Sequence, residues 1–317
     1  MDQLRSMRVF MRVIAEGSFA AAARGLDMAP AGVTRAVAEL EAHLGARLLN
    51  RSTRRLALTD TGQAYLERAQ RILAELDDAE ALAGAATRQP SGKLRVLCPP
   101  AFAAHQLVPQ LPRFRNQYPQ ITLELATPGA VEEADEDFDV SIVSVGQQPL
   151  QGDFIARPIA RSAFMVCAAP DYLERRGRPQ QPDELLAHDA VLPAVSALRR
   201  ELTLLRQSPN AGPADAVTIP TPAPVLVTPH LETMLAAAVA GLGIAGLPSF
   251  MVETALRDGR LEHLLPQWRG VTLGLYAAVP TRRHLPARTR VFIDFLAQAF
   301  GGGDHDPWWP AAPVRSR

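Results

Sequence analysis

The 317-residue chain is longer than a single hydrophobic core usually grows, so we expect two or three domains. Its composition, 47% apolar and 21% charged with zero net charge, is that of an ordinary soluble protein. It contains no run of about 18 apolar residues that would cross a bilayer and no secretory signal, so we expect a cytoplasmic protein without a membrane partner.

Charge is unevenly distributed along the chain. Residues 1–58 contain nine arginines against five acids, and four of these arginines lie between positions 47 and 55 with no acid among them. A basic end on an otherwise neutral protein predicts that this end contacts the phosphates of a nucleic acid.

Three short helices are predicted in this basic region. The first covers residues 4–15, and Ser18 is placed to N-cap the second, over residues 19–24. The third begins at Pro30, where a first-turn proline is tolerated, and ends near residue 43. A glycine follows each helix within two residues and is expected to end it.

The third helix has two different faces. Its apolar residues point in similar directions and are predicted to face the core: Val33, Val37, Leu40 and Leu44. The opposite arc carries small residues and an arginine, in place of the Lys and Glu usual on a solvated face: Ala31, Thr34, Arg35 and Ala38. Such a face can lie close to the floor of a DNA groove.

One long helix is predicted from residue 59 to residue 86, with Asp60 and Gln63 as a capping box. Apolar residues recur along it every 3.5 positions: Tyr65, Ala69, Ile72, Leu76, Ala79, Ala83 and Ala86. This period is typical of a coiled-coil seam, so we expect the helix to join two copies of the chain. Residues 89–92 are then predicted to form a hinge.

From residue 93 onward, predicted strands alternate with predicted helices. Strands are expected at residues 94–97, 121–125, 140–145, 164–168, 226–227, 244–247 and 273–279. Helices are expected up to Phe114 and near residues 171–176, 183–187, 231–240, 249–258 and 287–299. This alternation predicts an α/β domain with parallel strands, long enough for two subdomains.

Two segments of this region show no such pattern. Residues 207–224 contain five prolines and are predicted to be an irregular surface insertion. Residues 301–317, which include the pair Trp308 and Trp309, are predicted to be a flexible or loosely docked tail.

The N-terminal run GSFAAAARGLDMAPAGVTRAVAELEAHLGARLLNRSTRRLALTDTGQAYLERAQRIL resembles the signature of the LysR-type transcriptional regulators nearly end to end. The resemblance continues through GKLRVLCPPAF, LPRFRNQYPQITLEL, FDVSIV and AAAVAGLGIAGLPSF, and covers about residues 1–300. It implies a multidomain protein. An all-α winged helix-turn-helix domain and a long linker helix precede an α/β effector domain of two Rossmann-like subdomains, similar to type 2 periplasmic binding proteins.

The resemblance also implies domain boundaries. The DNA-binding domain would cover residues 1–58, the dimerising linker helix residues 59–89, and the effector domain residues 92–300. Within the effector domain, subdomain I would comprise about residues 92–162 and 268–300, and subdomain II about residues 163–267.

The resemblance assigns roles to residues of the first domain. Those implied to contact DNA, in the helices and the wing, are Ser18, Pro30, Ala31, Thr34, Arg35, Arg51, Arg54 and Arg55. Arginine suits base edges and phosphates alike because its guanidinium donates two parallel hydrogen bonds. The family often has a serine at position 29, and Ala29 removes a capping oxygen there.

The resemblance places an effector between the two subdomains. The residues implied to line its pocket are Pro100, Ala101, Phe102, Ser144, Val145, Gly146, Thr228 and His230. Many relatives have a hydroxyl residue after the first strand and an arginine near position 144, both of which this chain lacks. This departure favours a more apolar effector than a simple carboxylate, with Phe102 packed against it.

The partners implied are double-stranded promoter DNA, further copies of the chain and a small-molecule effector, with RNA polymerase as a further candidate. A dimer follows from the seam of the long helix, and a tetramer from the resemblance alone. No cofactor or metal is expected, because the seven histidines are scattered and the acidic run 132–139 suits an exposed turn.

Three other functions fit the sequence less well. Gly241, Gly243 and Gly246 match a dinucleotide-binding pattern, but they follow a helix and enter a strand, which is the reverse of the Rossmann order. Because GxSxG, P-loop and HExxH motifs are also missing, we do not expect an enzyme. A solute-binding module would leave the basic helices unexplained. Redox sensing through Cys98 and Cys167 stays open, although both lie among apolar residues.

Overall fold

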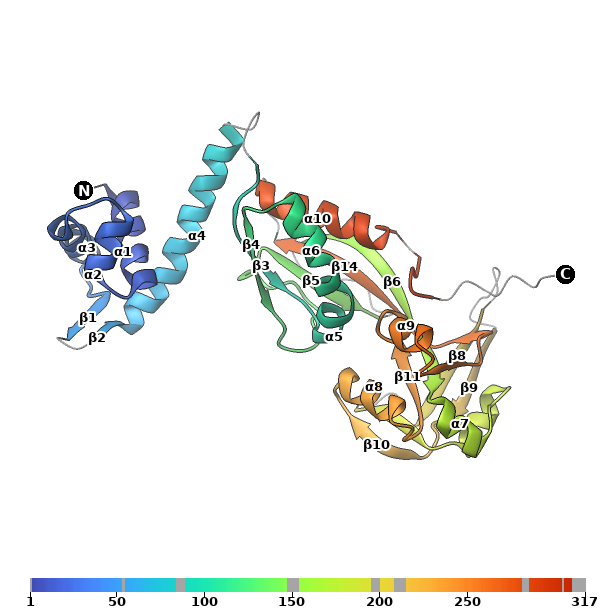
Figure 1. The fold of residues 1–317 in the computed structure, drawn as a ribbon. Coiled ribbons are helices and arrows are strands. Elements are labelled where there is room, and N and C mark those ends of the chain that lie inside the picture. Colours follow the sequence, from blue (N-terminus) through green and yellow to red (C-terminus); the bar gives the residue numbers. More distant parts are fainter. Residues whose placement is uncertain are drawn as a thin grey trace. The chain divides into compact units, whose positions relative to one another are not determined.

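In the computed structural model the chain forms two compact units, Met1–Gln89 and Pro90–Arg317 (Figure 1). The structure describes residues 2–52, 55–83, 89–146, 154–194, 200–207, 215–280, 285–303 and 305–309. No helix within these ranges is both long enough and apolar enough to cross a membrane.

Short helices, a hairpin and a long helix make up the first unit: α1 (Gln3–Glu16), α2 (Phe19–Gly25), α3 (Pro30–Leu44), β1 (Leu49–Ser52), β2 (Arg55–Leu58) and α4 (Asp60–Ala83). The predicted cap of α2 is confirmed, since the Ala21 N–H donates to Ser18 Oγ at 3.4 Å. Gly17 and Gly45 take the left-handed conformation that ends α1 and α3. Because Ala29 has no polar side-chain atom, α3 begins without a side-chain cap.

The inner face of α3 is as predicted. Val33, Val37 and Leu40 are fully buried and belong to one core with Phe10 of α1, while Leu44 is partly buried against it. The beginning of α4 differs from the prediction. Thr59, not Asp60, caps this helix: its Oγ1 accepts a hydrogen bond from the Gly62 N–H at 2.9 Å and donates one to the Arg47 carbonyl at 2.7 Å.

A backbone contact explains why Thr59 is the cap. The first turn of α4 lies so close to the residue before β1 that a Cβ at Gly62 would lie 2.0 Å from the Leu48 carbonyl oxygen. This approach brings Thr59 next to Arg47. The Thr59 hydroxyl can then hydrogen-bond both the Arg47 carbonyl and the first turn of α4. The Gln63 side chain reaches along the helix to Glu67 instead.

The second unit is built on one extended sheet in the order β10-β7-β11-β6-β14-β5-β3-β4, with β12 beside β6. Its strands are β3 (Gly92–Leu97), β4 (Ile121–Ala126), β5 (Val140–Val145), β6 (Phe154–Ala168), β7 (Ala190–Pro193), β10 (Pro224–Thr228), β11 (Ile244–Pro248), β12 (Glu262–Leu264) and β14 (Thr272–Pro280). Its helices are α5 (Pro100–Phe102), the π-helical η1 (Ala103–Leu107), α6 (Val108–Gln117), α7 (Pro170–Arg176), the 3₁₀-helical η2 (Pro182–Ala187), α8 (Leu231–Val239), α9 (Ser249–Arg257) and α10 (Ala287–Phe300).

Strand β6 connects the two halves of this sheet. Ala163 still pairs with Thr272 of β14, whereas Phe164 pairs with Pro248 of β11. The sequence predicted only the second half of β6, because Pro158 and the neighbouring arginines hide the strand pattern before residue 164. Pro158 is accommodated at an irregularity in the pairing of β6 with β14. Subdomain I is the half that contains β3, β4, β5 and β14, and subdomain II is the half that contains β7, β10, β11 and β12.

The described parts of two unpatterned segments are more ordered than expected. The proline-rich insertion contributes β9 (Ala216–Pro220), which pairs with β8 (Glu201–Arg206), and β13 (Trp268–Arg269) completes a separate three-stranded sheet. Near the C-terminus, Trp308 is only 6% exposed and packs in the main core, so residues 305–309 are held more firmly than the flexible or loosely docked tail that was expected. The physical reason is that the indole fills a place among buried aromatic rings.

Candidate functional site

The outer face of α3 is solvent-exposed, as its helical pattern predicted. Pro30, Ala31 and Thr34 are exposed, and the Thr34 hydroxyl donates to the Pro30 carbonyl at 3.0 Å. The Arg35 side chain is 82% exposed, with its Nε 2.8 Å from a carboxylate oxygen of Glu39 one turn later. A hydroxyl and a guanidinium therefore project together from a helix whose other side is anchored in the core.

A β-hairpin follows α3 and has the form of a wing. Arg51 pairs with Leu56 and Ser52 pairs with Arg55 across the two strands. Both β1 and the residue before it are tied to α3, because the Glu41 carboxylate accepts hydrogen bonds from the Leu48 and Leu49 N–H groups at 2.8 and 3.1 Å. Arg51 and Arg55 lie on the hairpin strands, whereas Arg54 lies outside the described residues.

The predicted seam of α4 divides into two parts. Tyr65 packs edge-on against Phe10, and Ala69 is fully buried beside Met7 and Leu73, so α1 of the same chain covers these two positions. Ile72 is 46% exposed and Leu76 is partly buried. Ala79 and Ala83 lie on the same helix.

Parallel strands define the candidate effector site. In subdomain I, β3 runs parallel to β4 and β5; in subdomain II, β7 runs parallel to β10 and β11. Ligands of open α/β sheets bind outside the carboxyl ends of such strands. The elements that leave these ends include α5 and η1 after β3, α8 after β10, and α9 after β11.

Two polar contacts join these elements across the subdomains. His105 of η1 lies 3.0 Å from a carboxylate oxygen of Glu232 in the first turn of α8. Gln106, the next residue, is buried and donates from Nε2 to the Phe250 carbonyl of α9 at 2.6 Å. The segment after β3 therefore contacts the helices that follow β10 and β11. These contacts join the carboxyl end of the parallel strands of subdomain I to that of subdomain II.

The predicted pocket residues have different environments. Pro100, Gly146 and His230 are exposed, Ser144 and Val145 are partly buried, and Ala101 and Thr228 are buried. Thr228 Oγ1 accepts from the His230 N–H at 3.3 Å, as in a turn that precedes a helix.

Phe102 lies inside the core. Its ring is fully buried among Phe250, Phe300 and Trp308, at centroid distances of 5.5, 5.3 and 6.1 Å, and has no exposed surface with which to contact an effector.

Sequence reasoning did not single out His105 or Gln106. Each is an isolated polar residue in an apolar, proline-flanked stretch, and no local spacing links either one to residues more than a hundred positions away. The unusual local signal is structural: the segment forms a π-helical turn, a feature often found at functional sites.

Both cysteines are fully buried. Burial raises the pKa of the Cys98 thiol and raises that of Cys167 to about 12. Their Sγ atoms lie 3.5 Å from backbone carbonyls, of Pro99 and Ala245 respectively. Since the thiolate is the reactive form, neither environment favours oxidation.

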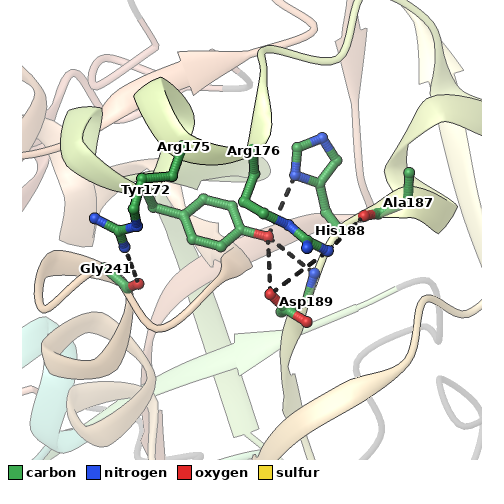
Figure 2. Close-up of polar contacts among 7 residues, drawn as sticks. All are labelled: Tyr172, Arg175, Arg176, Ala187, His188, Asp189 and Gly241. Atoms are coloured by element: carbon green, nitrogen blue, oxygen red, sulfur yellow. Dashed lines mark hydrogen bonds and ion pairs between the residues drawn. The ribbon is translucent and has the colours of Figure 1, made fainter.

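The glycine pattern at 241–246 serves the packing of subdomain II. Gly241 has a positive φ of 73°, and a Cβ at Gly243 would lie 2.4 Å from the Asp189 carbonyl oxygen. Figure 2 shows the polar contacts around this turn: Arg175 donates to the Gly241 carbonyl, and the Tyr172 hydroxyl accepts from the Asp189 N–H at 2.9 Å. Gly241 and Gly243 allow the backbone to turn and approach the beginning of β7, so these two glycines are explained without a dinucleotide.

Next to this turn, His188 and Tyr172 form a buried pair. His188 Nδ1 lies 3.3 Å from the Tyr172 hydroxyl, and Arg176 donates to the Ala187 carbonyl at 2.9 Å (Figure 2). Burial is the main cause that lowers the pKa of His188. Because His188 is 5% exposed and Tyr172 is 3% exposed, the pair fastens α7 to the beginning of β7 and has no open face for a substrate.

Two aspartates of the acidic run before β5 accept backbone hydrogen bonds. Asp139 Oδ2 accepts from the Arg95 N–H at 2.8 Å, and Asp135 Oδ1 accepts from the Asp137 N–H at 2.8 Å. Within the part of the chain that the structure describes, no group of three or more His, Cys, Asp or Glu residues is placed to hold a metal ion.

Both units match family models. The model described as "LysR substrate binding domain" matches residues 87–301, and that described as "Bacterial regulatory helix-turn-helix protein, lysR family" matches residues 4–63. The HTH-type transcriptional regulator YhjC of Escherichia coli is 35% identical to this chain over 94% of it and 97% of that protein. CrgA of Neisseria meningitidis serogroup C is 34% identical, over 93% of this chain and 96% of that protein.

Solved structures agree with the same assignment. The structure of CrgA, a LysR-type transcriptional regulator from Neisseria meningitidis, matches with a TM-score of 0.57 and 31% identity over 94% of this chain and 98% of that one. The full-length structure of AphB, a virulence activator of Vibrio cholerae, matches with a TM-score of 0.55 and 26% identity over 93% and 98% of the two chains.

Proposed function

Because the chain belongs to the LysR family of bacterial transcriptional regulators, we propose that it binds specific promoter DNA as a dimer and responds to a small-molecule effector held between its effector subdomains. This function places the protein in the cytoplasm, with RNA polymerase as a candidate partner at the promoter. The observation that carries the proposal is the exposed face of α3, where Thr34 and Arg35 project from a helix anchored by buried Val33 and Val37.

Arg35 supplies the chemistry for reading DNA. Its guanidinium can donate two parallel hydrogen bonds to a guanine edge or to phosphate oxygens. In the free protein it is paired with Glu39, but an ion pair this exposed contributes only about 0–1 kcal/mol, so DNA can replace it. We assign positioning contacts with phosphate to Ser18 and Thr34, and minor-groove contacts to the wing arginines.

We place the dimer contact on the later part of α4. Tyr65 and Ala69 are already covered by α1, which leaves Ile72 and Leu76 as the larger apolar residues available to a second copy. A two-fold dimer would present two recognition helices to half-sites about one helical turn apart. A tetramer is proposed on family resemblance alone.

We propose that the effector is mainly apolar and not a simple carboxylate. A helix N-terminus favours negative charge, and Glu232 already supplies a carboxylate in the first turn of α8. On the opposite side, Pro100 and Ala101 offer no hydroxyl. The polar groups left to orient a ligand are those of Ser144, Thr228 and His230.

The DNA-binding part is tested with the purified protein and labelled DNA from upstream of its own gene. Fluorescence anisotropy across a salt series, with random-sequence competitor, should show tight binding that weakens steeply with salt and survives competition. The Arg35→Ala variant should bind the specific site roughly 1–3 kcal/mol more weakly.

Arg257→Ala is the matched control, because Arg257 is also exposed and paired with a carboxylate four residues away, at 3.8 Å from Glu253. Equal affinity of the Arg35→Ala variant and the unchanged protein for the specific site would contradict the proposed role of α3. The effector part is tested by thermal-shift screening of metabolites, since a ligand of the folded state raises the melting temperature.

A further inference from the structure

Residues 305–309, named here the C-terminal strap, fold back onto the junction of the two effector subdomains. The Trp308 ring packs against Phe250 and Phe300 at centroid distances of 5.9 and 5.8 Å, in addition to Phe102. Its Nε1–H donates to Gln106 Oε1 at 2.8 Å. The indole ring is therefore surrounded by apolar side chains, and its N–H has a hydrogen-bond acceptor. Buried Trp side chains usually have both.

Asp306 fixes the strap through hydrogen bonds. Its carboxylate accepts from the Ser249 hydroxyl at 2.7 Å, from the Ala163 N–H at 2.7 Å and from the Trp308 N–H at 3.1 Å. Ser249 is itself fully buried and lies 2.8 Å, oxygen to oxygen, from the Ser162 hydroxyl. Burial raises the pKa of Asp306, whereas these donors favour its ionised form.

The partners of the strap lie on both sides of the point where the pairing of β6 passes from β14 to β11. Ala163 is the last residue of β6 that pairs with β14 of subdomain I, and Ser249 begins α9 of subdomain II. The backbone adds a contact with subdomain I, because the Arg161 N–H donates to the His305 carbonyl at 2.9 Å. A contact with subdomain II is added by Trp309, whose ring lies edge-on to His263 of β12 at 5.2 Å.

The strap also reaches the segment that faces the candidate effector site. Gln106 accepts from Trp308 with its oxygen and donates to the Phe250 carbonyl with its nitrogen, so one amide joins the strap, η1 and α9. The preceding residue, His105, contacts Glu232 of α8. A change in the docking of Trp308 would therefore be transmitted through Gln106 to the side of η1 that contacts subdomain II.

We propose that the C-terminal strap holds the two effector subdomains in the arrangement in which His105 meets Glu232, with Asp306 and Trp308 as its positioning residues. When the strap is undocked, the subdomains separate at the point where the pairing of β6 passes from β14 to β11, and the effector site widens. Any effect of the strap on effector binding rests on the proposed function, because the effector site is part of that proposal. Its test needs neither DNA nor effector, so the two proposals can fail separately.

The test measures how readily the two subdomains can be cross-linked. The full chain carries His105→Cys and Glu232→Cys, which put one thiol on each side of the contact. Its own two cysteines are both buried. The experiment measures the rate at which a short thiol-specific cross-linker joins positions 105 and 232. The chain with an intact strap should couple readily. The Asp306→Ala variant, which removes the acceptor of three hydrogen bonds, should slow coupling roughly 5- to 30-fold, and truncation before residue 305, which also removes the Trp308 ring, should slow it at least as much.

A truncation before residue 310 is the matched control, because it keeps the strap and should couple at the unchanged rate. If the larger truncation fails to fold, the milder Ser249→Ala variant, which removes one donor to Asp306, should still slow coupling measurably. If positions 105 and 232 are cross-linked at the same rate in the Asp306→Ala variant, the Ser249→Ala variant and the chain with an unchanged strap, the proposal is overturned.

Discussion

His105 and Glu232 are 127 residues apart in the sequence, yet Nε2 of the imidazole lies 3.0 and 3.2 Å from the two oxygens of the Glu232 carboxylate. The contact joins the turn after β3 to the first turn of α8, and so connects the two subdomains beside the candidate effector site. The imidazole is 25% exposed and the carboxylate 49% exposed. The pair is therefore hydrated enough to break and re-form at little cost, as the proposed effector site requires.

We expect the coupling free energy between His105 and Glu232 to be small. A double-mutant cycle with His105→Ala and Glu232→Ala, measured by urea unfolding of the full chain, should give less than about 1 kcal/mol, the range measured for exposed polar side-chain pairs. Arg178 and Glu262 provide a comparison, because two hydrogen bonds of 2.8 and 2.6 Å join them and should give a larger coupling. A value above about 2 kcal/mol for the first pair would mean that it is too strong to act as an adjustable contact.

Removing the partner of Arg35 should strengthen DNA binding. In a Glu39→Gln variant the guanidinium no longer has to leave a carboxylate, and a negative charge near the phosphates is lost. Affinity should rise by roughly 0.3–1 kcal/mol at low salt and by less at high salt, because exposed charges are screened. Anisotropy titrations at several salt concentrations measure this, with Glu253→Gln as the control that should leave affinity unchanged. Weaker binding by the Glu39→Gln variant would show that Glu39 itself contributes to the DNA contact.

Neither cysteine should react in the native protein. Cys98 and Cys167 are fully buried, and burial keeps both thiols protonated at neutral pH by raising their pKa. A maleimide reagent should label the folded chain at neither site and label both after denaturation, as read by mass spectrometry. Peroxide at concentrations that leave methionines intact should not alter DNA affinity. A loss of affinity that is absent in Cys98→Ala would restore redox sensing as a function.

Protonation of His263 should destabilise the fold at acidic pH. Burial lowers the pKa of this imidazole from 6.5 to about 4, and its Nε2 has no hydrogen-bond partner among the described residues. Because the folded pKa lies below the unfolded one, the stability contributed by the neutral ring is present above pH 6.5 and is lost as the pH falls towards 4. The free energy of unfolding should therefore fall by roughly 2 kcal/mol between pH 7 and pH 5.

Chemical unfolding of the full chain at both pH values measures this loss. A His263→Phe variant should show a smaller decrease in stability, because its ring cannot take up a proton, while the exposed His230→Phe variant should retain the decrease of the unchanged protein. An identical decrease in all three proteins would mean that His263 does not control the pH dependence.

Much of the first unit can be predicted from local sequence. The spacing of Val33, Val37 and Leu40 determines which face of α3 is buried, and glycines mark where the helices end. The order of strands and helices also identifies the second unit as α/β, because periodicity depends on neighbours within a few residues. Where local signals compete, prediction fails: Pro158 hides the first half of β6, and the cap of α4 falls on Thr59 because of the contact with Arg47.

The sequence by itself determined the family, the buried and exposed faces of α3 and the alternation of elements, since these depend on residues close together in the chain. Only the tertiary structure decided that Phe102 and Trp308 share one core, that Ala69 faces α1, and that His105 meets Glu232. These contacts join residues tens to hundreds of positions apart. They arise because β6 runs through both halves of the extended sheet and brings the ends of distant strands together, which no local pattern records.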